Sequence, residues 1–258
     1  MKLQILLNQQ ERKFNSPDFI PSDPISIPRR YSKKEDIEIS GFLTALISWG
    51  SRKAILNSAQ LLMDLMGNEP HNFILSASDK ELKQFANFQY RTFKTSDLLF
   101  IVEVLKNIYT SEDGLEGIFT ENFRSTGLVR SAIIGLRERF LQTPHLSRSE
   151  KHLANPDKGS AAKRINMYLR WMVRSDDKGV DFGLWEQIPM SALMIPLDLH
   201  TGATARKLGL LHRKQNDWKA VEELTQNLRK FDPEDPVKYD FALFGMGIHR
   251  YFPREKQE

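Results

Sequence analysis

A lysine and an aspartate, each near the predicted start of a helix, are the residues of this chain best suited to covalent chemistry. Asp198 follows the apolar run Ile195–Leu197 and starts a short predicted helix that ends near Gly209. Lys163 lies in the first turn of an earlier helix, predicted to start near Ser160. A neutral amine can act as a Schiff-base nucleophile, and a carboxylate can stabilise developing positive charge. The pair could therefore carry out chemistry on a nucleobase.

The surroundings of Lys163 favour an uncharged amine, because the helix dipole and the nearby Lys158, Arg164 and Arg170 all disfavour an additional ammonium. Helical spacing predicts a buried stripe and an exposed basic face on this helix. The stripe comprises Ile165, Tyr168, Leu169 and Met172, and the basic face comprises Lys163, Met167, Arg170 and Arg174. Plainer roles stay open: Asp198 could simply cap its helix, and Lys163 could face solvent or a phosphate.

The composition excludes several kinds of site. The chain of 258 residues has no cysteine, which excludes disulfides, thiolate-bound iron–sulfur clusters and cysteine zinc sites. Its six histidines are scattered without the spacing of metal ligands, so we expect neither a metal nor another cofactor. No apolar run approaches about 18 residues, and the first residues do not resemble a signal peptide. We expect a soluble, cytoplasmic protein with no membrane segment.

The charge is more informative in its distribution than in its total. Lysine and arginine number 37 against 33 acidic residues, a net charge of +4 that favours nucleic acid only weakly. Residues 200–214 hold four basic residues and no acid, and residues 124–152 are also rich in arginine. Acids gather instead at 176–186 and 232–240. This segregation suggests a basic face, although ordinary solvated helix surfaces would also account for it.

Helical periodicity runs through most of the chain, and no stretch alternates with period two for long enough to form a convincing strand. Capping boxes are predicted at Ser32 with Glu35 and at Ser78 with Glu81. Further helices are predicted over about 36–49, 52–66, 96–105, 115–123, 128–141, 160–171, 198–209 and 217–228, with a last one starting at Asp235-Pro236. The predicted fold class is all-α, an irregular two-lobed helical array.

We expect one unit of two interleaved lobes rather than separate domains. Residues 36–150 form mainly the first lobe, 151–215 a hairpin and the Asp198 helix, and 216–258 the returning helices. The ends, up to Pro28 and from Pro253, look like arms laid over the core. Gly245 and Gly247 lie inside the last helix, where glycine costs about 1 kcal/mol each, which suggests close packing against a neighbour.

The order of these motifs resembles the helix-hairpin-helix DNA glycosylase superfamily. A glycine-containing turn and the Lys163 helix precede Ile-Pro-Leu-Asp-Leu-His and then Arg206 with Leu-Gly-Leu, which is similar to that superfamily's Val-Asp-Thr-His followed by Arg-x-x-x-Arg-Leu-Gly-Leu. Residues 39–55 resemble its first core helix, and residues 238–248 its last packed helix. The closest similarity is to an uncharacterised bacterial family related to the archaeal 8-oxoguanine DNA glycosylases.

The resemblance implies a base-excision repair enzyme that acts on double-stranded DNA with a damaged base, an oxidised or alkylated purine. Lys163 would attack the sugar carbon C1′ and allow strand cleavage, and Asp198 would stabilise the charge on the sugar or activate the lysine. The implied base-pocket residues are Trp49, Ser51, Arg52, Asp240 and Phe244. Those implied to contact DNA are Lys158, Gly159, Arg164, Arg170 and Arg206. We expect a monomer that associates with the nucleoid.

Two departures from the superfamily pattern keep other functions open. The hairpin lacks its first glycine and places Lys163 four residues after Gly159 rather than two, and Leu199 replaces the usual threonine after the aspartate. A DNA-binding protein that keeps the fold without the reaction is one alternative. A helical scaffold for protein interactions, in which the lysine and aspartate are surface charge and cap, is the other.

Overall fold

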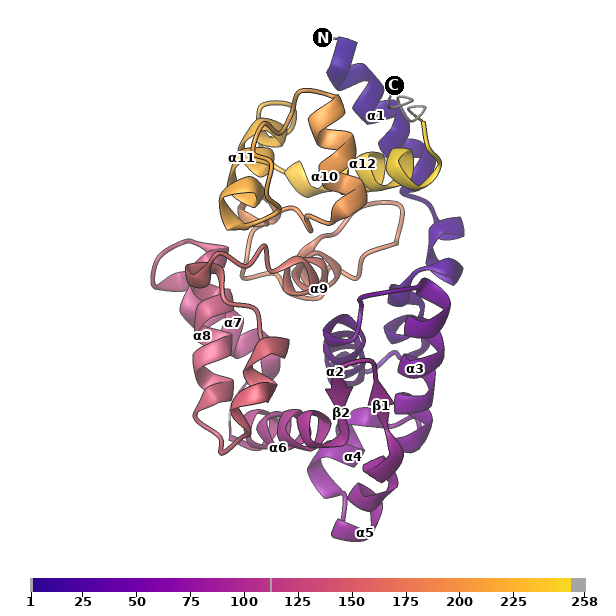
Figure 1. Ribbon diagram of the computed structural model, residues 1–258, viewed down its shortest axis with the longest axis vertical. Helices are drawn as coiled ribbons and strands as arrows, with labels where there is room; N and C mark the ends of the chain where they lie inside the picture. Colours follow the sequence, from indigo (N-terminus) through magenta and orange to yellow (C-terminus); the bar gives the residue numbers. More distant parts are fainter. Residues whose placement is uncertain (1, 112, 252–258) are drawn as a thin grey trace. The chain divides into compact units, whose positions relative to one another are not determined.

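The computed structural model describes residues 2–111 and 113–251 (Figure 1). These residues form an all-α fold, as predicted, and its strands are limited to a two-residue hairpin of β1 (Gln89–Tyr90) and β2 (Phe93–Lys94). The chain divides into two compact units. The middle unit is Ile20–Asn155, and the terminal unit combines Met1–Phe19 with Pro156–Glu258. The first 19 residues thus belong with the C-terminal half of the chain.

The middle unit is built around a helix that is buried along most of its length. This helix is α2 (Lys34–Leu46), in which every residue from Ile37 to Leu46 is buried. The short helix η1 (Pro17–Ser22) spans the boundary between the two units. The middle unit also contains η2 (Pro24–Ser26), η3 (Pro28–Arg30), α3 (Arg52–Leu65), α4 (Pro70–Ser76), α5 (Asp79–Leu82), η4 (Lys83–Asn87), α6 (Thr95–Ser111), α7 (Gly114–Arg124), α8 (Val129–Leu141) and η5 (Ser147–His152).

The two predicted capping boxes have different outcomes. Ser78 and Glu81 form the full reciprocal box at the start of α5, so this prediction is confirmed. At α2 the prediction is wrong, because the N-cap is Lys33 and no side chain caps the helix. Ser32 lies one residue too early, and the Asp36 carboxylate instead accepts a hydrogen bond at 2.9 Å from the backbone N–H of His71.

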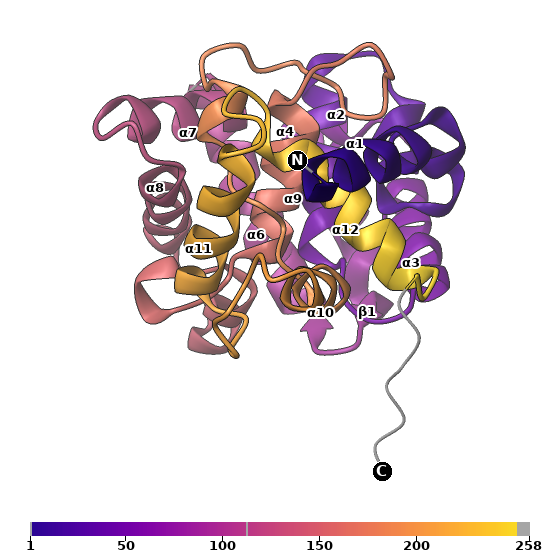
Figure 2. The same cartoon turned by 90° about the horizontal axis from the view of Figure 1, so that it is seen from above.

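The terminal unit contains the two helices that carry the candidate catalytic residues. They are α9 (Lys163–Val173) and α10 (Leu199–Lys207). The remaining elements are α1 (Lys2–Phe14), η6 (Pro156–Lys158), η7 (Met190–Ala192), α11 (Trp218–Arg229), η8 (Pro236–Lys238) and α12 (Tyr239–Ile248). The N-terminal segment was expected to be an arm laid over the core, and its helix α1 packs against α12, as Figures 1 and 2 show. The arm expected from Pro253 lies outside the described residues.

Two glycines allow α12 to approach both of its helical neighbours. A Cβ atom on Gly245 would lie 2.2 Å from a ring carbon of Phe14 in α1. A Cβ atom on Gly247 would lie 2.9 Å from the Cβ of His200 and 3.1 Å from its carbonyl oxygen in α10. The prediction that these glycines mark close helix packing is confirmed.

Gly245→Ala should lower the free energy of unfolding by about 1–3 kcal/mol, because the added methyl overlaps the Phe14 ring. Phe14→Ala removes that ring, so the double variant should lose less stability than the two single variants together. Urea denaturation of the four proteins measures this coupling. Strictly additive losses would contradict the packing argument.

Candidate active site

Lys163 is the first residue of α9, at the end of a tight turn. The preceding Ala162 has a left-handed backbone with φ of 47°, so the helix begins at Lys163 rather than at Ser160 as predicted. The Ser160 hydroxyl accepts a hydrogen bond from the Ala162 N–H at 3.2 Å, and the Gly159 carbonyl accepts one from the N–H of Trp218. The turn is therefore tied to the start of α11, and it leaves Lys163 partly buried in the first helical turn.

Asp198 is the N-cap of α10. Its Oδ1 accepts a hydrogen bond from the backbone N–H of Thr201 at 2.9 Å, and its carbonyl accepts one from the Asn216 side chain at 3.0 Å. The next residue, Leu199, is 82% exposed. Asp198 thus has the capping role that its residue type predicts, and its partly buried carboxylate is held in one orientation.

A buried carboxyl group lies within electrostatic reach of both candidate catalytic residues. Asp240 of α12 is 7% exposed, and burial raises its pKa to about 6. Arg170 opposes this shift, the negative charge of Asp198 adds to it, and the positive charge of Lys163 reduces it. Both candidate catalytic residues therefore contribute to the electrostatics of this buried carboxyl group.

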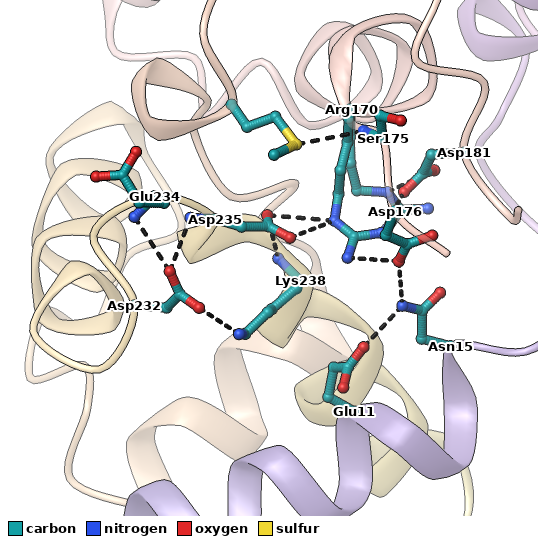
Figure 3. Close-up of polar contacts among 12 residues, drawn as sticks. Glu11, Asn15, Arg170, Ser175, Asp176, Asp181, Asp232, Glu234, Asp235 and Lys238 are labelled. Atoms are coloured by element: carbon teal, nitrogen blue, oxygen red, sulfur yellow. Dashed lines mark hydrogen bonds and ion pairs between the residues drawn. The ribbon is translucent and has the colours of Figure 1, made fainter. Parts of the chain in front are cut away.

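Two arginines of α9 are buried among carboxylates, and Figure 3 labels Arg170 with Asp176, Asp181 and Asp235. Arg170 and Arg174 are 4% and 1% exposed. Asp181 lies between them, with one oxygen 3.2 Å from Nε of Arg170 and the other 3.1 Å from Nη1 of Arg174. Arg174 also pairs with Asp176 at 2.8 Å and with Asp235 at 2.9 Å. Burial alone would lower the pKa of Arg174, but these three carboxylates raise it above its ordinary value.

The prediction of an exposed basic face on this helix is therefore wrong for Met167, Arg170 and Arg174, which are all buried. Arg170 also cannot serve as the predicted phosphate contact, because Asp181 and Asp240 already occupy its guanidinium. The partners come from the two acid-rich stretches, 176–186 and 232–240. The sequence signal for this cluster was the presence of these acid-rich stretches together with two arginines one helical turn apart, Arg170 and Arg174.

The other residues predicted to contact DNA have mixed surroundings. Lys158 and Gly159 are exposed in the turn before α9. Arg164 is partly buried, and burial lowers its pKa to about 10. Arg206 donates to the carbonyl of Arg213 at 2.9 Å and to the Asn216 side chain at 2.6 Å, so it orders the loop that also binds Asp198.

Two predicted base-pocket residues belong to the terminal unit. Asp240 is already bonded through both oxygens, to Nη1 of Arg170 at 2.6 Å and to the Thr201 hydroxyl at 3.1 Å. Both Asp240 oxygens thus have partners within the protein, and its contact with a base stays a prediction. Phe244 is partly exposed, and its ring meets the ring of His200 edge-on at 6.1 Å between centroids.

The other three predicted base-pocket residues belong to the middle unit. The Trp49 ring meets Tyr90 edge-on at 5.1 Å and stacks on His152 at 6.0 Å, while the Tyr90 hydroxyl donates to the Trp49 carbonyl. The Ser51 hydroxyl caps α3 by accepting from the N–H of Ala54. Arg52 is partly buried at the first position of α3. Their contact with a base stays a prediction.

Thr201 and Asn216 are the site residues that the sequence analysis missed. Thr201 lies three residues after the N-cap Asp198, the position whose N–H a cap usually binds, and this spacing was the available signal. Asn216 lies far along the chain, and nothing in its sequence context predicts that it binds the Asp198 carbonyl.

Comparison with known proteins identifies the family. Residues 23–249 match the family described as "Protein of unknown function (DUF2400)", so the chain belongs to it. No curated protein and no solved structure matches the chain. Within residues 2–111 and 113–251, no helix has the length and apolar character to cross a membrane, and no group of three or more potential ligands could hold a metal ion.

Asp181→Asn should lower the free energy of unfolding by about 3–5 kcal/mol, because it leaves two buried guanidiniums short of a negative charge. The matched control is Asp177→Asn, since Asp177 is exposed and pairs only with the nearby Lys178, so its loss should stay below about 1 kcal/mol. Denaturation at neutral pH compares the two. Equal small losses would show that the buried cluster does not stabilise the unit.

Proposed function

We propose that this member of the DUF2400 family is a DNA glycosylase, with lyase activity, that releases an oxidised or alkylated purine from double-stranded DNA. The Nζ lone pair of Lys163 bonds to C1′ while the bond from C1′ to the base breaks and its electron pair leaves with the base, which takes up a proton. The amine then loses one proton, and the bond from C1′ to the ring oxygen breaks as that oxygen takes up a proton, which gives a protonated Schiff base. Removal of a C2′ proton forms the C2′–C3′ double bond while the C3′–O bond breaks, so the 3′ phosphate leaves and the strand is cleaved.

One observation carries this proposal. Lys163 is the first residue of α9 and Asp198 is the N-cap of α10, so both groups stand at helix starts within the same compact unit. An amine and a carboxylate at two helix starts are the groups that attack at a sugar carbon requires. The resemblance of the surrounding motifs to helix-hairpin-helix glycosylases supplies the substrate class and the two-lobed fold type.

The asymmetric capping of Asp198 is compatible with a catalytic role. Its Oδ1 is bound by the N–H of Thr201, which fixes the plane of the carboxylate and leaves Oδ2 for the developing positive charge on the sugar. The exposed Lys158 and the open backbone at Gly159 lie just before α9, where they can contact the phosphates of a strand that presents its base. Extrusion of that base costs a few kcal/mol, which such contacts offset.

Lys163→Gln should abolish the borohydride-trapped protein–DNA adduct and strand cleavage, while duplex binding stays nearly intact because one cation among several is lost. Asp198→Asn keeps a side chain that can cap α10, so it should fold. Its base release should still slow by orders of magnitude, because an amide cannot balance positive charge on the sugar. Lys158→Gln, which removes the exposed lysine of the preceding turn, is the matched control and should still form the adduct.

Duplexes carrying 8-oxoguanine or an alkylated purine are the substrates for these assays. If Lys163→Gln forms the adduct as well as the wild type, the nucleophile is another lysine, with Lys158 the next to test. If the wild-type protein releases no base from any damaged duplex, the glycosylase proposal fails.

A DNA-binding protein without catalysis is the second candidate. It is favoured by the apolar, exposed Leu199 beside Asp198 and by the capping bond that already occupies one Asp198 oxygen. Both candidates require phosphate contacts, so affinity for plain duplex DNA should fall steeply between about 50 and 200 mM salt. A flat response in fluorescence anisotropy titrations would instead favour a scaffold for protein interactions.

A further inference from the structure

We infer that Asp240 is a positioning residue that holds Asp198 in place through Thr201. The link has two hydrogen bonds, both from Thr201, which has no exposed surface. Its backbone N–H donates to Asp198 Oδ1 at 2.9 Å, and its hydroxyl donates to Asp240 Oδ1 at 3.1 Å. The catalytic meaning of this link rests on the proposed function, but the link itself does not.

Asp240 is suited to this role because its own position is fixed. Its second oxygen accepts a hydrogen bond from Nη1 of Arg170 at 2.6 Å, and Arg170 is in turn fixed by Asp181. The close approach of Gly247 to His200 keeps α12 against α10, the helix that carries Thr201. A chain of bonds therefore runs from the buried arginines of α9 to the carboxylate at the start of α10.

The same link makes the orientation of Asp198 depend on pH. Charged groups on both neighbouring helices act on Asp240: Arg170 and Lys163 from α9, and Asp198 from the cap of α10. Asp181 shares the Arg170 guanidinium with it. Burial raises the pKa of Asp240 from 3.8 to about 6. Above that pH the ionised carboxylate is a strong acceptor for the Thr201 hydroxyl, and below it the protonated form is a weaker one.

The stability of the protein should respond in the opposite sense. The folded pKa of Asp240 lies above its unfolded value, so the contribution of this group to stability is fully present below about pH 4 and is lost as pH rises through about 6. The ionised Asp240 thus lowers stability while it orders Asp198. This combination is typical of functional sites rather than of groups kept for stability.

NMR of the full chain labelled with ¹⁵N-threonine tests the inference without any substrate. In the wild type, the Thr201 amide signal should shift with pH with a midpoint near 6, because its acceptor moves when Asp240 ionises. Asp240→Asn should abolish that titration. Thr201→Val, followed with ¹⁵N-valine, removes the hydroxyl with little change in shape and should also abolish it, which keeps the test valid if the Asp240 variant does not fold.

Thr204→Val is the matched control, because Thr204 lies on the same buried side of α10 but its hydroxyl lies against Gly247. It should leave the Thr201 titration intact. With a lesion-containing duplex, Asp240→Asn and Thr201→Val should slow base release at least tenfold with little change in KM. The pH–rate profile of the wild type should have an inflection near pH 6, and the profiles of both variants should lack it.

The two proposals can fail separately. A Thr201 amide signal with the same position and pH response in the wild type and in Asp240→Asn overturns the positioning role whatever the activity. A wild-type protein that shows the titration but releases no base contradicts the glycosylase and leaves the link between Asp240 and Asp198 established.

Discussion

The terminal unit depends on the burial of two guanidinium groups on one turn of α9. Arg170 and Arg174 are almost wholly removed from water, and each such ion carries a penalty of several kcal/mol unless carboxylates surround it. The carboxylates come from two other segments, Asp181 in the irregular chain after α9 and Asp235 and Asp240 near the last helix. These ion pairs therefore hold both segments against α9. The ring of Phe241, which lies against both guanidinium groups, adds cation–π contacts.

This constraint has a direct consequence at the other end of α9. With the helix immobilised through its second half, the left-handed turn at Ala162 determines where Lys163 begins the helix. The same buried cluster reaches Asp240, and through Thr201 it reaches Asp198. The two residues proposed as catalytic are thus linked to one network, although they lie on different helices. The proposed charge stabilisation at a sugar carbon would need this kind of preorganisation.

Local rules predicted much of the fold, because the helices begin at capping residues such as Ser78 and Asp198 and carry clear apolar stripes. They could not predict that Arg170 and Arg174 are buried. An arginine in a polar stripe is expected to be exposed, and its burial here depends on ion pairs with carboxylates from other segments of the chain. Helix α1 was not predicted, and Leu7 is its buried residue. Asp198 and Lys163 were identified from spacing and resemblance, whereas Thr201 and Asn216 act through tertiary contacts that no local pattern records.

The central proposal is that the Lys163 amine is the nucleophile. The most direct measurement is mass-spectrometric mapping of the wild-type protein after borohydride reduction on a duplex that contains 8-oxoguanine or an alkylated purine. Digestion with protease and nuclease should leave a reduced sugar fragment on one peptide, covalently attached at Lys163. Attachment at Lys158 or at any other lysine, or a protein that carries no sugar fragment after reduction, would contradict the account.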